Sequence, residues 1–310
     1  MGGARALSRP DRRGVRRRAD SGPRCYGRAV SRELVEVAPG VLVATSRTMT
    51  TTSTAVLRGG DALLVDPAWH PDELAGLADA LDARGRRVVA GIATHAHHDH
   101  LLWHPRYGDV PRFASPRTVA LARQHRFELR AALVGGEGSE AAGAESWTPE
   151  LLGLVGAVQP WAPPRAGIRS AGSGGVESAE RMPTAELPGE PELVVHDAHA
   201  PGHCAVWLDE PRVLLAGDML SDVELPLPFD PDDLPAYLDG LDRLSPYVAR
   251  ARVVVPGHGR PTSDGSARLD ADRRYLDAVI TGRDPDDERR EHPGMAEVHA
   301  RIRALATAQH

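Results

Sequence analysis

Residues 94–100 constrain this chain more than any other segment, because they place four histidines and one aspartate directly after an apolar run. They read Thr-His-Ala-His-His-Asp-His, and residues 88–93 before them have the composition of a buried strand. Neutral imidazole suits zinc and similar metals, and a carboxylate adds negative charge and oxygen ligands. The sequence therefore predicts a loop at a strand end that supplies ligands to two metal ions.

Three further candidate ligands stand later in the chain, at the ends or flanks of other apolar runs. Each comes directly after a glycine, and they are His203, Asp218 and His258. A glycine permits the sharp backbone turn that a chain needs where it leaves a strand. We expect these side chains to reach the histidine-rich loop from other strand ends of the same face.

The chain contains the motif H-x-H-x-D-H, followed by a single His, a single Asp and a final His. With these motifs in this order, the chain resembles the metallo-β-lactamase fold superfamily over about residues 33–265. The resemblance implies an α/β fold, a four-layer αββα sandwich, with the site between the sheet edges. It implies two divalent ions, one bound by His95, His97 and His203, the other by Asp99, His100 and His258, with Asp218 bridging them. Asp66 matches the early aspartate of the family, which orients the metal loop.

The ligand set lacks cysteine and is similar to that of the glyoxalase II and lactonase branches, which makes antibiotic hydrolysis the weaker prediction. It predicts a hydrolase in which a bridging hydroxide attacks an ester, thioester or lactone of a small molecule. Metal coordination lowers the pKa of water from 15.7 toward ~7. We expect zinc, with manganese or iron as alternatives, and Asp99 as a catalytic residue that orients the hydroxide or accepts its proton.

Two other activities stay open within the same superfamily. One is a mononuclear iron persulfide dioxygenase, because that branch uses a related motif set. The other is a phosphodiesterase or nuclease. Residues 30–310 carry 28 arginines against 41 acidic residues, and such an acidic body argues against nucleic-acid binding.

The pattern of apolar residues predicts strands that alternate with helices in two similar halves. The expected strands are 34–37, 41–45, 54–57, 62–65, 88–93, 193–195, 205–208, 213–216 and 253–255. The expected helices are 71–82, 116–133, 231–248, 267–280 and 295–306. Strands and helices in this order favour two sheets flanked by helices.

Two segments fall outside this pattern. Residues 1–29 carry nine arginines and no apolar periodicity, which predicts an extension without fixed structure or a start codon assigned too far upstream, with Val30 as the alternative start. Residues 135–191 are rich in Gly, Pro, Ser and Glu and are predicted to be an insertion in the domain 30–310, either a lid or disordered. No run reaches the ~18 apolar residues of a membrane helix, and no secretory signal is visible, so we expect a cytoplasmic protein.

Several residues near the motifs are candidates for supporting roles. His199 could hydrogen-bond a ligand and fix its tautomer. Cys204 is expected to be a small buried side chain. The residues predicted to bind substrate follow the metal loop and the bridging aspartate, and they are Trp103, Met219, Leu225 and Phe229.

Overall fold

The computed structural model describes residues 32–135, 147–161, 186–229 and 233–308. The predicted extension 1–29 lies outside these residues, as does part of the insertion 135–191. No helix among the described residues is long and apolar enough to cross a membrane.

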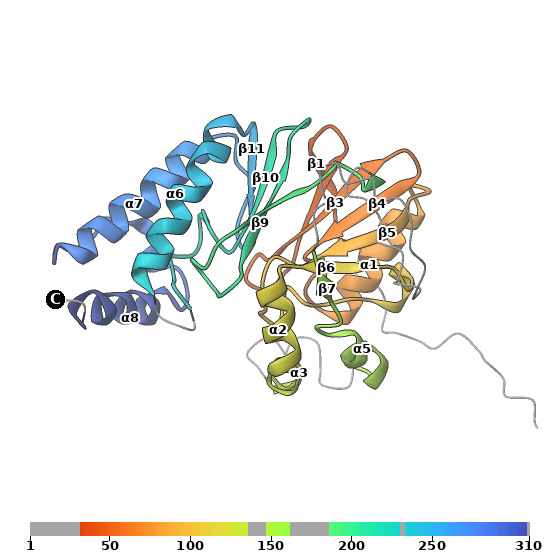
Figure 1. The fold of residues 1–310 in the computed structure, drawn as a ribbon, viewed down its shortest axis with the longest axis horizontal. Coiled ribbons are helices and arrows are strands. Elements are labelled where there is room, and N and C mark those ends of the chain that lie inside the picture. The colour runs from red at the N-terminus through yellow and green to blue at the C-terminus, as the bar shows by residue number, and fades with distance from the viewer. Residues whose placement is uncertain (1–31, 136–146, 162–185, 230–232, 309–310) are drawn as a thin grey trace, which may run out of the picture.

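A seven-stranded sheet forms the N-terminal half, with its strands in chain order from β1 to β7 (Figure 1). Its first four strands pair antiparallel, and the strands from β4 to β7 run parallel to one another. The strands are β1 (Val35–Ala38), β2 (Val41–Thr45), β3 (Thr52–Arg58), β4 (Asp61–Val65), β5 (Arg87–Ile92), β6 (Arg112–Ala114) and β7 (Gln159–Pro160).

A four-stranded sheet forms the C-terminal half, in the order β11-β10-β9-β8. Only β10 and β11 are parallel in it. Its strands are β8 (Glu192–Val195), β9 (Cys204–Leu208), β10 (Val213–Gly217) and β11 (Val253–Pro256).

Helices cover the outer face of each sheet (Figure 1). On the first sheet they are α1 (Pro71–Asp82), α2 (Pro116–Gln124), α3 (Arg126–Gly135), α5 (Pro149–Leu154) and the short 3₁₀ helix η1 (Pro105–Tyr107). On the second they are α6 (Leu234–Arg250), α7 (Gly265–Ile280), α8 (Met295–Ala308) and the 3₁₀ helix η4 (Glu288–Glu291).

Successive side chains along each strand pack on opposite faces of the sheet, and this alternation explains the layers of the fold. In β4, Ala62 and Leu64 pack with Leu74 of α1, whereas Leu63 and Val65 belong to the cluster between the two sheets. Side chains of a strand point alternately to its two faces, so both faces of a fully apolar strand must be covered. The second sheet alternates in the same way between the intersheet cluster and the α6, α7 and α8 cluster. The predicted αββα sandwich is confirmed.

The structure differs from the sequence prediction in three places. The short strand β6 was not predicted. The helix predicted over 116–133 is two helices, α2 and α3, which meet at His125. In the insertion, residues 147–161 form α5 and β7, with Trp147 and Leu151 buried in the core of the first half. The backbone N–H of Gly156 also donates to the carbonyl of Leu101, so this part of the insertion supports the segment after the metal loop.

One edge of the sandwich collects the strand ends that carry the motifs. Because β4 and β5 are parallel, and β10 and β11 are parallel, the carboxyl ends of each pair lie at one edge of their sheet. Backbone hydrogen bonds join the two halves there. The N–H of Cys204 donates to the carbonyl of Thr94 (2.9 Å), and the N–H of Thr52 to the carbonyl of Gly257 (2.7 Å).

Candidate metal centre

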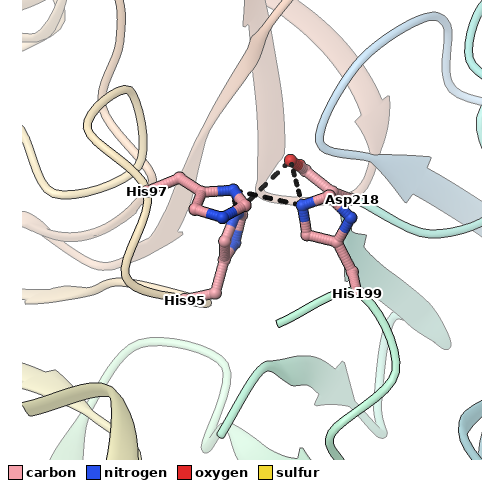
Figure 2. Close-up of side chains that lie close together, drawn as sticks. All are labelled: His95, His97, His199 and Asp218. Carbon is pink, nitrogen blue, oxygen red and sulfur yellow. Dashed lines mark hydrogen bonds and ion pairs between the residues drawn. The ribbon is translucent and has the colours of Figure 1, made fainter. Parts of the chain in front are cut away.

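Four side chains from three segments converge in a first ligand group, His95, His97, His199 and Asp218 (Figure 2). Their ligand atoms all lie within 4.8 Å of one another. His95 Nε2 is 2.8 Å from His97 Nδ1 and 3.3 Å from Asp218 Oδ2. Three nitrogens and a carboxylate oxygen at this spacing form a suitable ligand set for a divalent ion.

The sequence prediction assigned His203 to this ion, whereas the structure brings His199 into the candidate group. Nε2 of His199 lies 3.1 Å from His97 Nδ1 and 3.4 Å from Asp218 Oδ2. Its Nδ1 lies 2.9 Å from the carbonyl oxygen of Leu227. A carbonyl can only accept, so Nδ1 carries the proton and Nε2 keeps its lone pair for a metal.

His203 lies on the other side of the turn that separates the two histidines. The turn 200–202 contains Gly202 in a left-handed conformation (φ 77°), and β9 begins directly after His203. Nε2 of His203 accepts a hydrogen bond from the backbone N–H of Asp218 (3.1 Å), and Nδ1 faces His196 Nε2 at 3.2 Å. In this structure the candidate ligand group therefore contains His199, whereas His203, the residue assigned from the sequence, lies directly beside it, with its ring centroid 4.9 Å from that of His95.

A second ligand group consists of Asp99, His100 and His258. Oδ2 of Asp99 lies 3.1 Å from His100 Nε2 and 3.3 Å from His258 Nε2. All three side chains are buried. This group contains the residues that the sequence assigned to the second ion.

Asp66 orients the second group from the end of β4. Its Oδ1 accepts the backbone N–H of Thr94 (2.9 Å), and Oδ2 accepts the Thr94 hydroxyl (2.6 Å). Oδ2 also lies 2.9 Å from Nδ1 of His100. The carboxylate therefore fixes the start of the metal loop and leaves His100 Nε2 as the atom that faces the site.

Asp218 contacts both groups and provides the test of whether they fit metal ions. Its Oδ1 is buried and accepts no hydrogen bond from the described residues, although His100 Nε2 lies 3.1 Å away. Its Oδ2 is 3.4 Å from His258 Nε2. A buried carboxylate oxygen of this kind is unfavourable unless a cation compensates it, so the residues fit divalent ions.

Glycine at position 257 makes room for this carboxylate. A Cβ on Gly257 would stand 2.0 Å from Asp218 Oδ1, closer than atoms can approach. The backbone N–H of Gly257 also donates to the carbonyl of Gly217, directly before the aspartate (2.6 Å). The Pro-Gly-His sequence at the end of β11 thus has two roles. It places His258, and it allows Asp218 to pack closely.

Charge differs between the two groups. Burial lowers the pKa of His97 well below its usual value and that of His199 to about 3. Burial also opposes the charged form of His100, but Asp218 and Asp99 outweigh it and raise the pKa of His100 well above its usual value. Burial also opposes the charged form of His258, but Asp218 and Glu224 outweigh it and raise the pKa of His258 well above its usual value. Burial opposes ionisation of Asp99, but His100 and His258 outweigh it and lower its pKa well below the usual value.

The sequence reasoning missed the contacts on the far side of His258. Nδ1 of this histidine lies 3.1 Å from the carbonyl oxygen of Met49 and 3.2 Å from Oγ1 of Thr51. Glu73 of α1 fixes that loop, because its carboxylate accepts the Ser46 hydroxyl (2.7 Å) and the N–H of Arg47 (3.0 Å). No local motif signals these contacts, since they join segments about 200 residues apart in the sequence.

Three of the four residues predicted to bind substrate are in the core. Trp103 packs against Gly91 and donates from Nε1 to the carbonyl of Gly108 (3.2 Å), and Met219 and Leu225 are buried beneath α6 to α8. Large apolar side chains next to a ligand gain more from burial in the core than from lining an open site. Phe229 differs, because it is 37% exposed and its ring centroid lies 4.9 Å from that of His97.

The remaining histidine of the metal loop and the cysteine have ordinary environments. His98 is half-buried and lies edge-on to the ring of Trp69 at 5.2 Å. Cys204 is buried, its thiol lies 3.4 Å from the carbonyl of Thr94, and burial raises its pKa. A thiol in this state is unreactive and packs as a small apolar side chain.

Histidines and aspartates at strand ends between two sheets define a metallohydrolase-type centre. Residues 47–258 match the family model of the metallo-beta-lactamase superfamily, so the chain belongs to this superfamily. Its members are generally metal-dependent hydrolases. No curated protein matches the sequence.

Solved structures share the fold at low sequence identity. A metallo-beta-lactamase family protein from Thermus thermophilus is 21% identical with a TM-score of 0.55, covering 88% of this chain and 94% of that one. A metallo beta lactamase from Erythrobacter litoralis is 19% identical with a TM-score of 0.52 (76% and 94%). The metallo-beta-lactamase FIM-1 from Pseudomonas aeruginosa, in its mono-zinc form, is 15% identical with a TM-score of 0.52 (79% and 98%).

Proposed function

We propose that this protein is a hydrolase with two divalent metal ions, zinc in the first instance, and that its substrate is a small-molecule ester, thioester or lactone. The observation that supports this most is the position of Asp218 between two complete ligand groups. His95, His97 and His199 would bind one ion and Asp99, His100 and His258 the other, with Asp218 in contact with both.

Bound divalent ions lower the pKa of coordinated water and polarise the carbonyl of a substrate. The chain's own contribution is to fix the orientation of the ligands. His199 is oriented by Leu227 and His100 by Asp66, so each presents Nε2 to the site. Asp99 remains ionised at neutral pH and is the carboxylate that could orient a water molecule or accept its proton.

A substrate panel tests this proposal. Purified protein loaded with zinc, manganese or iron is assayed with p-nitrophenyl esters, acyl thioesters, lactones and bis-p-nitrophenyl phosphate. We expect turnover of at least one of the first three classes and loss of that activity in His97→Ala. Activity that survives in His97→Ala would place the reaction elsewhere, and hydrolysis of the phosphodiester alone would replace the proposed substrate class.

A further inference from the structure

The turn that follows Asp218 has an unusual backbone. Leu220 adopts a left-handed conformation (φ 61°), and its side chain is only 1% exposed. This conformation is unfavourable for a leucine, because its Cβ approaches the backbone too closely, and it persists only where the surroundings fix it. The turn 219–224 therefore needs partners that hold it in place.

Two buried charged residues from the C-terminal helices contact this turn. Nη1 of Arg289, in η4, donates to the carbonyls of Ser221 (3.0 Å) and Glu224 (3.1 Å). The same nitrogen lies 2.6 Å from Oδ1 of Asp272, in α7, and the nearby backbone N–H of Leu220 favours the charged form of this carboxylate. The side chains of Asp272 and Arg289 are 1% and 7% exposed.

The turn also contacts the second ligand group. The Ser221 hydroxyl donates to the carbonyl of His258 (2.7 Å) and accepts the N–H groups of Val223 (3.1 Å) and Glu224 (3.0 Å). The carboxylate of Glu224 lies 3.9 Å from Nδ1 of His258. Asp218 itself stands two residues before the strained leucine, so a shift of the turn would move ligands of both groups, and His258 most directly.

The chemistry of Asp272 and Arg289 fits a role in holding the turn 219–224 better than a purely stabilising role. A buried ion pair often adds little net stability, because desolvation of the two charges offsets their attraction. A guanidinium, however, has five N–H donors in a fixed plane and can satisfy several oxygens at once. In Arg289, the two N–H groups of Nη1 are shared between the two carbonyls of the turn and Asp272 Oδ1, and Nε and Nη2 donate to Asp287.

We propose that Asp272 and Arg289 are positioning residues of the metal centre, which hold the turn 219–224 in its strained form and thereby place His258 and Asp218. This inference rests on the proposed two-metal site. It connects the C-terminal helices, which carry no candidate ligand among the described residues, to the chemistry at the edge of the sheets.

The test measures zinc affinity, which a merely structural residue would leave unchanged well below the melting temperature. Zinc dissociation constants for both ions are determined by competition with a chromophoric chelator in wild type, Arg289→Met, Arg289→Lys and Asp272→Asn. Arg283→Met is the matched control, because Arg283 pairs with exposed Asp277 at the end of α7. Melting temperatures are measured in parallel.

We expect Arg289→Met and Asp272→Asn to lower the affinity for the second zinc ion by about tenfold or more. Removal of residues that orient metal ligands has an effect of this size in other proteins. Affinity for the first ion should fall less, because Asp218 is the one member of its group that adjoins the turn. Arg289→Lys should recover part of the affinity, and the control should match wild type. If Arg289→Met does not fold, Asp272→Asn and Arg289→Lys decide the question.

Lower melting temperatures with both zinc constants unchanged in Asp272→Asn and Arg289→Lys would overturn the inference. Wild-type protein that binds one zinc ion or none would instead contradict the two-metal site itself. The two failures are therefore distinguishable in the same titration.

Discussion

The two ligand groups share Asp218 but differ in the charge that surrounds their histidines. In the first group, burial keeps the pKa values of His97 and His199 low, so both imidazoles are neutral at neutral pH. In the second, the carboxylates near His100 and His258 raise their pKa values well above the usual range. Without metal, protons therefore compensate the carboxylates of the second group, whereas the first group already offers free lone pairs to a cation.

One loop, residues 94–100, supplies side chains to two candidate ligand groups that differ in the charge of their histidines. The environment decides the difference, because His199 is oriented by a neutral carbonyl, that of Leu227, while His258 lies close to Asp99 and Glu224. We therefore expect the first group to bind its ion with little proton release and the second to exchange protons for metal.

Asp218→Asn should have the largest effect, because this carboxylate contacts histidines of both groups. We expect loss of both ions and a decrease in kcat/KM of about a thousandfold or more, equivalent to ~4 kcal/mol in the barrier. Metal analysis and steady-state kinetics measure the two effects. A variant that keeps two ions and its activity would show that Asp218 does not connect the groups.

His199→Ala and His203→Ala separate the ligand of the first group from its neighbour. We expect His199→Ala to lower the affinity for the first ion by at least about 100-fold. The loss of a ligand should reduce metal affinity at least as much as the loss of a residue that orients a ligand. His203→Ala should keep both ions, with affinity for the first lowered by about tenfold, because it removes an acceptor for the N–H of Asp218. The reverse order of effects in a chelator titration would restore the assignment made from the sequence.

The pH dependence of metal affinity should differ between the two groups. Because the pKa values of His100 and His258 are raised, both histidines are protonated below those pKa values and must lose a proton to bind metal. The dissociation constant of the second ion should therefore rise as pH falls, by about tenfold per pH unit for each displaced proton. The first ion should change much less over the same range, because His97 and His199 are neutral throughout. Equal slopes for both ions in titrations at several pH values would contradict the comparison.

Asp66→Asn should affect the second group more than the first. It removes a charge from the partner of His100 Nδ1 but keeps the shape of the side chain. We expect affinity for the second ion to fall by about tenfold, within the range found for residues that orient metal ligands. Zinc titration of this variant beside wild type measures both constants, and a larger loss of affinity for the first ion would contradict this prediction.

Phe229→Ala should have the smallest effect. The exposed ring lies against His97 and outside both ligand groups, so its removal should raise KM by about fivefold, equivalent to ~1 kcal/mol, with kcat little changed. A large loss of kcat with intact metal content would mean that the ring acts on the reacting group. Trp103→Phe is the matched aromatic control, because Trp103 is buried in the core of the first half.

The layers of the fold could be predicted because the strands carry a strong two-residue period. Leu63 and Leu64 are adjacent and equally buried, yet one faces the other sheet and the other faces α1. The break between α2 and α3 at His125 could not be predicted, because neither proline nor glycine marks it. The helix α5 could not be predicted, because the composition of its segment indicates a loop.

The metal loop could be recognised from its own residues, but the third histidine of the first group could not. His199 and His203 flank the same Ala-Pro-Gly turn, and only the fold shows that β9 starts directly after the second of them. The glycine before His203 permits the turn between the two histidines, and it does not distinguish which of them faces an ion. The contacts of Arg289 with residues 221 and 224 join segments more than 60 residues apart, and no local pattern reveals them.

Metal stoichiometry tests the central claim most directly. Wild type, His97→Ala and His258→Ala are purified, reconstituted with zinc, freed of excess metal and measured by mass spectrometry. The two-group arrangement predicts close to two zinc ions per wild-type chain and close to one in each variant, with a different ion lost in the two cases. No zinc in the reconstituted wild type, or two ions retained in both variants, would contradict it.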